Sequence, residues 1–515
     1  MRYVRPPADQ SGTKGGVGSL FPLRPSTRKL RVAVDVAMLG EPTQETMRVL
    51  ARDEEVEPLL LVQNEALEPT QWMQALGCRR WYQFTFTTVA QAPRFMDSST
   101  VGVSRFEDGT LTLATRGHFF SVYAMLDEAA RAAYSDDAGI TLADRHRAAA
   151  LASAAGALGA DVVVTVAPTV GRDDVADNDL VASVTPGQLI PLFGHYLRMT
   201  GNPVLAVTRW VLGGESTFTQ TLHATSVADL YLAGINASGS HLHAIQLMAM
   251  KDGDHNLVRS MEAIALRLSR AARAVDHLLA ALSNGTSTDT QRFDTAETAA
   301  EAFDRMLLYL CAAMDRYARV TRTLFDTTLD PETQRCSLTS IDELRSVIAK
   351  FELTDTARLE TQGSYAWVIG KLRNRIHALP LDTQHQLTRS YGSSTTVAIT
   401  LDGLSELDPA TTPLSQGQLD RLGVWNAQSS NPFHPRAYAA DIATVATALF
   451  KETLRYVENF SQFIIRTKPL ATITTPQHPV LGCWADDPQP MPGAMANELL
   501  YQEMLGWAYF GLGEV

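Results

Sequence analysis

Residues 252–283 carry apolar side chains every three or four positions, and this pattern constrains the fold more than any other feature of the sequence. Members of the pattern include Val258, Met261, Ile264, Leu268 and Val275. The spacing predicts one long amphipathic helix, because residues three and four apart share a helix face. Such a helix must bury its apolar face against another element. The polar residues 284–288 are typical of a helix end and a linker, so we expect a domain boundary near residue 284.

Beyond this boundary the helical spacing continues along most of the chain. It predicts four further helices, at about 296–325, 341–351, 355–379 and 435–465. Ser340 and Glu343 have the spacing of a capping box, which supports the start of the second of these helices. Residues 395–401 are typical of a short strand or an extended arm. We therefore predict a mostly α-helical domain, a bundle over 295–467, and a C-terminal extension over 468–515 that is rich in proline and aromatic residues.

The first half of the chain alternates short, continuous apolar runs with helical segments. The runs cover residues 30–39, 58–62 and 162–166, and the helical segments cover 43–52 and 143–158. Continuous apolar runs are typical of strands buried on both faces, so the alternation predicts a mostly parallel sheet covered by helices. Residues 102–120 predict a hairpin with its turn at 106–110. We expect an α/β domain over 29–284 that includes the long helix at its end, and a flexible tail over 1–28, which lacks periodicity.

Composition and charge limit the class of protein. The chain has 515 residues, too many for one hydrophobic core, and 44 Lys and Arg against 56 Asp and Glu give a formal charge of −12. That acidity argues against a protein that coats DNA non-specifically, although it leaves room for one local basic cleft. The four cysteines are too scattered for a zinc site or a disulfide framework. No stretch is apolar and long enough for a signal peptide or a membrane span, so we expect a cytoplasmic protein with no membrane partner.

Residues 365–380 carry the most informative polar pattern. The apolar stripe of this predicted helix, which Pro380 ends, consists of Tyr365, Ile369, Leu372, Ile376 and Leu379. Arg373 and His377 lie one turn apart beside this stripe, with Asn374 between them. Imidazole exchanges protons near neutral pH and guanidinium binds a phosphate through two hydrogen bonds, which suits RNA chemistry with the 2′-hydroxyl as nucleophile and no metal. In the alternative interpretation, which the spacing alone favours, Arg373 pairs on the bundle surface and His377 is a hydrogen-bonded residue near a helix end.

The segment 367–377 resembles the polar signature of the HEPN family of four-helix bundles, many of which are RNases in toxin and antiphage systems. The resemblance implies a metal-independent endoribonuclease in a defence or stress system, acting on RNA as a homodimer that forms through the bundle. The residues that it implies are Arg373, Asn374 and His377 for catalysis, and Lys371 and Arg375 for RNA binding. Three residues separate Arg373 from His377, where the family has four to six, and non-catalytic members keep a related helix end. The alternative is a non-catalytic interaction or assembly protein.

The N-terminal domain has a fainter resemblance to PIN-like metal-dependent nucleases; a Rossmann-like sheet also fits its pattern. The resemblance is carried by Asp35, after the first apolar run, and by the segment 148–165, which contains Asp161. It implies that Asp35 and Asp161 hold Mg²⁺ or Mn²⁺, which activates a water, if the N-terminal acids converge. Ala149 and Ala167 stand where the family has acids. The alternative is therefore a degenerate, non-catalytic sensor or docking domain that binds no metal.

Overall fold

The computed structural model describes most of the chain between residues 29 and 467. The described residues are 29–52, 55–63, 68–86, 100–118, 139–170, 181–200, 204–205, 220–221, 228, 231–232, 234–236, 238–284, 292–325, 336–350, 356–389, 395–427 and 437–467. The chain divides into two compact units, which span Met1–His223 with Leu387–Thr396 and Ala224–Gln386 with Val397–Val515. We call them the sheet unit and the helical unit. The predicted tail over 1–28 and the predicted extension over 468–515 lie outside the described residues.

A seven-stranded sheet forms the centre of the sheet unit, in the order β5-β4-β3-β2-β1-β6-β7. Its strands are β1 (Leu30–Asp35), β2 (Val56–Gln63), β3 (Arg80–Phe86), β4 (Thr100–Glu107), β5 (Thr110–His118), β6 (Val162–Val164) and β7 (Ala182–Val184). Strands β3, β2, β1, β6 and β7 are parallel to one another. The β4–β5 hairpin extends the sheet beyond β3, with which β4 pairs in the antiparallel orientation. The hairpin turns at Asp108 and Gly109, both with positive φ, as a tight hairpin turn requires. The predicted mostly parallel sheet is confirmed.

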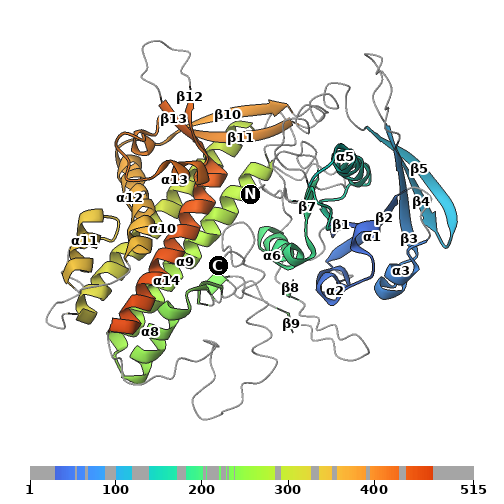
Figure 1. Ribbon diagram of the computed structural model, residues 1–515. Coiled ribbons are helices and arrows are strands. Elements are labelled where there is room, and N and C mark those ends of the chain that lie inside the picture. Colours follow the sequence, from blue (N-terminus) through green and yellow to red (C-terminus); the bar gives the residue numbers. More distant parts are fainter. Residues whose placement is uncertain are drawn as a thin grey trace. The chain divides into compact units, whose positions relative to one another are not determined.

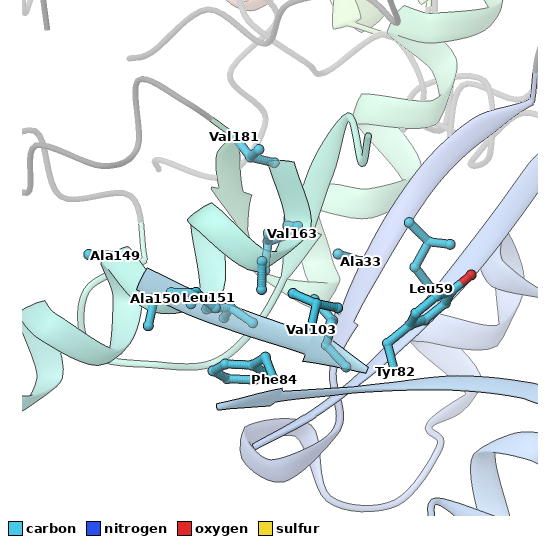
Figure 2. Close-up of a cluster of buried hydrophobic side chains, with 14 residues drawn as sticks. Ala33, Leu59, Tyr82, Phe84, Val103, Ala149, Ala150, Leu151, Val163 and Val181 are labelled. Atoms are coloured by element: carbon cyan, nitrogen blue, oxygen red, sulfur yellow. The ribbon is translucent and has the colours of Figure 1, made fainter. Parts of the chain in front are cut away.

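Helices cover the sheet and complete its core. They are α1 (Val36–Leu39), α2 (Gln44–Leu50), α3 (Thr70–Leu76), α5 (Leu142–Ala157), α6 (Leu189–Thr200) and the 3₁₀ turn η2 (Pro186–Gln188), and a short ladder pairs β8 (Val204–Leu205) with β9 (Gln220–Thr221). A capping box of Thr141 and Asp144 starts α5. Figure 2 shows the alanine-rich face of α5 against Phe84 and Val103 of the sheet. The strand expected over 30–39 ends earlier, at Asp35, because the last part of that apolar run forms α1.

The direction of strand addition reverses between β1 and β6. Strands β1 to β3 extend the sheet to one side, and β6 and β7 extend it to the other. In open parallel sheets such a switch point leaves a crevice outside the carboxyl ends of the two strands, where ligands bind most often. Asp35 and Thr165 occupy the carboxyl ends of β1 and β6 at this point.

Long helices form most of the helical unit. They are α8 (Ser240–Lys251), α9 (His255–Asn284), α10 (Arg292–Phe325), α11 (Ile341–Lys350), α12 (Ala357–Ala378), α13 (Gln416–Arg421) and α14 (Ile442–Thr467), with the 3₁₀ turn η4 (Ser405–Leu407). Helix α14 packs against α8, α9, α10 and α12, and Figure 1 shows α9, α10 and α14 side by side. Large aromatic side chains fill the space between them, among them Phe303, Tyr317, Tyr365, Phe450 and Phe460. The expectation of a helical C-terminal region is confirmed.

A four-stranded sheet accompanies these helices, in the order β10-β11-β13-β12. Its strands are β10 (Asp382–Arg389), β11 (Thr395–Asp402), β12 (Val424–Ala427) and β13 (Ala437–Asp441). Only β11 coincides with an extended segment that the sequence predicted. The helix expected from residue 435 begins at Ile442, because the residues before it pair with β11 and β12 as strand β13.

The expected domain boundary near residue 284 differs from the division in the structure, which falls after residue 223. The long helix α9 was expected at the end of the α/β domain, but it packs extensively against α10 and also against α8 and α14. Its apolar face is therefore buried inside the helical unit. No helix in the described ranges has an apolar stretch that would reach across a bilayer.

Candidate functional site

Helix α12 presents its last turn at the protein surface. Three members of the expected apolar stripe, Tyr365, Ile369 and Leu372, are almost fully buried, whereas Ile376 is half-buried and Leu379 is exposed. The helix ends at Ala378 because Leu379 adopts an extended backbone, which is the conformation that a residue before proline prefers. Burial of the middle turns and exposure of the last one place the polar residues 373–377 where solvent can reach them.

The side chains of Arg373, Asn374 and His377 all reach solvent on this last turn. Arg373 is half-buried, whereas Asn374 and His377 are exposed. An Nη1 hydrogen of Arg373 is donated to the Asn374 side-chain oxygen over 3.0 Å. Within the described ranges, no hydrogen bond or ion pair engages the imidazole of His377. Since residues four apart are neighbours on a helix surface, the guanidinium and the imidazole can contact one ligand together.

Lys371 and Arg375, the two predicted RNA contacts, have different surroundings. Lys371 is exposed, and its ammonium lies 5.2 Å from the centre of the Trp367 ring, a cation–π arrangement. Arg375 donates from Nη1 to the carbonyl oxygen of Gly403 over 2.7 Å and to a carboxylate oxygen of Glu406 over 3.1 Å. Arg375 therefore ties the end of α12 to the turn after β11, and Glu406 compensates its charge.

Two cavities flank the Arg373–Asn374 pair. Arg373 lines one of about 340 Å³ together with Arg267, Arg270 and Cys311. Burial is the main reason that the pKa of the Cys311 thiol rises to about 12, so this cysteine stays protonated and is not a nucleophile. Asn374 lines the other cavity, of about 550 Å³, whose walls include Trp367 and the start of α11. His377 stands at the exposed helix end and lines neither of them.

In the sheet unit, Asp35 is enclosed by hydrogen-bond donors. Its side chain is fully buried, and the guanidinium of Arg147 donates to both carboxylate oxygens, over 2.8 and 2.7 Å. The hydroxyl of Thr165 donates to one of the same oxygens over 2.8 Å. Gln63 holds Arg147 in turn, by accepting its Nε hydrogen over 2.7 Å. The positive charge that balances Asp35 is therefore an arginine of α5.

Asp161 lies at the amino ends of strands β1 and β6, whereas Asp35 lies at the carboxyl end of β1. The parallel register of β1 and β6 pairs Val32 with Val162, so Asp161 stands beside Arg31 and accepts its backbone N–H over 2.8 Å. Asp35 is four residues further along β1, which corresponds to about 13 Å at roughly 3.3 Å per residue. The hypothesis that these two acids share a metal ion is therefore wrong. In the part of the chain that the structure describes, no three or more His, Cys, Asp or Glu side chains gather in a way that could hold a metal ion.

Sequence reasoning missed the arginines that surround these positions. Arg147 lies within an alanine-rich helix, where nothing in the sequence marks it as the partner of Asp35. Arg267 and Arg270, and likewise Arg316 and Arg319, are three residues apart on long amphipathic helices. That repeated spacing puts each pair on one helix face and was a signal that could have been used.

No family model, curated protein or solved structure matches this chain. A proposal for the function of this chain therefore depends on its sequence and on the geometry within each unit.

Proposed function

We propose that the helical unit is a metal-independent endoribonuclease whose active centre is the last turn of α12. One observation carries this proposal: Arg373 and His377 lie one turn apart, both reach solvent, and the imidazole is not engaged by another described group. The imidazole of His377 is therefore accessible to a ligand that also contacts Arg373 on the same helix face.

The proposed reaction uses the 2′-hydroxyl of RNA as the nucleophile. His377 takes the 2′-hydroxyl proton while the 2′-oxygen forms a bond to the neighbouring phosphorus, and the bond from phosphorus to the 5′-oxygen breaks. The leaving 5′-oxygen takes a proton from a protonated His377 in a second copy of the chain. Arg373 stabilises the charge that builds up on the phosphate oxygens, and its bond to Asn374 orients it. The products are a 2′,3′-cyclic phosphate and a 5′-hydroxyl.

The proposal assigns different tasks to the two neighbouring cations. Lys371 is exposed and contacts the RNA backbone. Arg375 is a positioning residue, since its bonds to Gly403 and Glu406 fix the end of the helix. The homodimer and a role in defence or stress regulation belong to the same proposal and follow from the resemblance of the helix end to HEPN proteins. The proposal also places the protein in the cytoplasm.

The test is cleavage of single-stranded RNA by the purified full-length protein in EDTA. We expect cleavage to 2′,3′-cyclic phosphate ends and a loss of at least about 100-fold in rate for His377→Ala, the usual contribution of a general base. Arg358→Ala is the matched control, because Arg358 is an exposed residue of the same helix at its other end. Equal cutting by His377→Ala would refute the proposal. Cutting that requires Mn²⁺ and persists in His377→Ala would move the activity away from the last turn of α12.

The second candidate is a non-catalytic assembly module. It is favoured by the three-residue spacing of the motif and by Leu379, which is 70% exposed next to the site and could pack against a partner. In that case no RNA is cut, and Leu379→Glu changes the molar mass measured by light scattering. The endoribonuclease proposal instead requires cleavage, with His377→Ala leaving the molar mass unchanged.

A further inference from the structure

Helices α9 and α10 run in opposite directions and are joined by arginine side chains along one surface. Arg267 of α9 donates to the carbonyl oxygen of Ala312 of α10 over 2.7 Å. Arg316 of α10 donates to the hydroxyl of Ser260 of α9 over 2.8 Å. Higher numbers on one helix thus meet lower numbers on the other, and the two contacts lie one turn apart on α10 and two turns apart on α9. The arginines therefore form a row along the seam between the helices.

Two adjoining cavities follow this seam. One, of about 320 Å³, has Arg267, Arg316 and Arg319 in its wall, and the other, of about 340 Å³, has Arg267, Arg270 and Arg373. The cavities share Arg267, Ala312 and Asp315, so they lie next to each other along the seam. We call the two cavities together the arginine groove. It leads to Arg373 of the proposed active centre.

The arginine groove is strongly positive although the chain as a whole is acidic. Five arginines and one carboxylate, Asp315, line the groove, a formal charge of +4 against −12 for the whole protein. Two of these guanidinium groups, those of Arg267 and Arg373, donate to the uncharged oxygens of Ala312 and Asn374. Such bonds orient a guanidinium without cancelling its charge. Outside the groove, Arg305 of the same helix α10 lies 3.7 Å from the carboxylate of Glu301.

The dimensions and the apolar lining of the groove fit an extended chain of phosphates. From Leu308 to Arg319 the groove follows α10 for about 16 Å, at 1.5 Å per helical residue, which exceeds the size of one phosphate. Tyr309 and the partly exposed Leu308 line the end near Arg373. A cationic groove with an aromatic side chain is typical of proteins that bind single-stranded nucleic acid, because bases stack on the ring while cations contact the backbone.

We propose that the arginine groove binds the backbone of single-stranded RNA and leads it to Arg373. This inference rests on the proposed function and deepens it by assigning the surface that holds the substrate. The binding is electrostatic and independent of base sequence. With five phosphate contacts, each contributing about 0.7 to the slope of log affinity against log salt for a single strand, a rise from about 50 to 200 mM salt lowers the affinity about 100-fold.

The experiment measures binding apart from cleavage. The full-length protein is titrated into a labelled 2′-O-methyl oligouridylate, which has no free 2′-hydroxyl and cannot be cut. We compare Arg270→Glu and the double variant Arg270→Glu/Arg316→Glu with Arg358→Glu, which makes the same charge change about 22 Å from Arg373 along α12. Thermal melting checks that each variant is folded. Arg270 is exposed, so Arg270→Glu keeps the test informative if the double variant fails to fold.

We expect Arg270→Glu to bind the RNA several-fold more weakly than the wild type. The double variant is expected to bind at least tenfold more weakly, and the slope of its log affinity against log salt is expected to be smaller by about 1.4. Arg358→Glu is expected to bind like the wild type. The matching DNA oligonucleotide is expected to bind no more tightly than the RNA. Normal binding by folded groove variants, or an equal loss in Arg358→Glu, would overturn the inference. So would tighter binding to DNA, or displacement of the RNA by polyglutamate at the same concentration of charge.

Failure of the inference and failure of the proposed function give different results. If the wild type binds 2′-O-methyl RNA in a groove-dependent way but does not cut unmodified RNA, the arginine groove stands and the endoribonuclease proposal fails. If the protein cuts RNA in a His377-dependent way and the groove variants bind normally, the enzyme stands and the substrate path lies elsewhere.

Discussion

Arg147 and Asp35 form a two-point ion pair at the carboxyl end of the central strand β1, with N–O distances of 2.7 and 2.8 Å. The carboxylate is fully buried, and 15% of the arginine side chain is exposed. Taking both charges out of water is costly, so the pair adds little net stability, whereas removal of one partner leaves the other uncompensated. The pair therefore fixes the position of α5 relative to the point where the order of strands reverses.

Replacing one member of this pair is expected to destabilise the protein strongly. Asp35→Asn leaves the guanidinium of Arg147 without its counter-charge, at a cost of about 3 kcal/mol, and the double change with Arg147→Gln recovers part of that loss. Urea unfolding measures both. Glu57→Gln is the control, since Glu57 pairs with Arg31 at 2.9 Å on the same sheet but is 43% exposed, which limits the loss to about 1 kcal/mol or less. Additive losses in the double variant would contradict the coupling.

Arg375 and Glu406 are expected to contribute to stability and not to RNA affinity. Their side chains are 24% and 15% exposed, so the ion pair is partly shielded from water. A double-mutant cycle of Arg375→Gln and Glu406→Gln is expected to give a coupling of about 1 kcal/mol in thermal or urea unfolding. Binding of 2′-O-methyl RNA stays within twofold of the wild type for Arg375→Gln, whereas Lys371→Gln weakens it. A large loss of affinity in folded Arg375→Gln would return this residue to the RNA-binding surface.

The helix end at residues 373–377 shows how much of the candidate site the sequence can predict. The spacing of Tyr365, Ile369 and Leu372 fixes which face of α12 is buried, and Pro380 fixes where the helix stops. Both are local properties, so exposure of the last turn follows from them. The partners of the charged residues do not follow, because they come from elsewhere in the chain. Glu406, which engages Arg375, is 31 residues away and lies beyond two strands.

Asp35 shows the same limit in the sheet unit. Its place at the end of a buried strand is predictable from the apolar run before it, but its environment depends on Arg147, 112 residues further along the chain. The parallel register of β1 and β6 places Asp161 at the amino ends of these strands, away from Asp35, and this register is set by pairing between distant segments. The long helix α9 was assigned to the wrong side of a boundary for a related reason, since its periodicity shows that a face is buried but not which element covers it.

Glu458 of α14 is expected to stabilise the packing of α8. Its carboxylate accepts the backbone N–H of His241 over 3.0 Å and the hydroxyl of Ser240 over 2.9 Å, and it lies 2.6 Å from the His241 imidazole. These donors belong to the first turn of α8, where a negative charge also interacts favourably with the helix dipole. Glu458→Gln keeps the shape of the side chain and loses the charge, at an expected cost of about 1 to 2 kcal/mol in urea unfolding. Glu301→Gln on the exposed face of α10 is the control, and an equal loss there would contradict this role.

Asp304 is expected to oppose folding at neutral pH. Burial is the main reason that the pKa of its carboxyl rises from 3.8 to about 6 within α10, and repulsion from Glu297 adds to it. A carboxyl with a higher pKa in the folded state binds its proton more tightly there than in the unfolded chain. The stability that this proton supplies is present below about pH 4 and is lost as the pH rises to about 6, because the folded state must then hold a poorly hydrated charge.

Asp304→Asn removes that charge and is expected to stabilise the protein at neutral pH. A shift of about two pKa units corresponds to roughly 2.7 kcal/mol, and since the side chain is only half-buried, solvent screening reduces the expected gain to about 1 kcal/mol. The difference between variant and wild type in urea unfolding should be largest above about pH 7 and should become small near pH 3, because Asp304 is then mostly protonated in both the folded and the unfolded state. Glu262→Gln, an exposed change on α9, should show no such dependence on pH. A gain for Asp304→Asn that is the same at both pH values would mean that the asparagine stabilises the fold through its packing and that the carboxylate charge is not the cause.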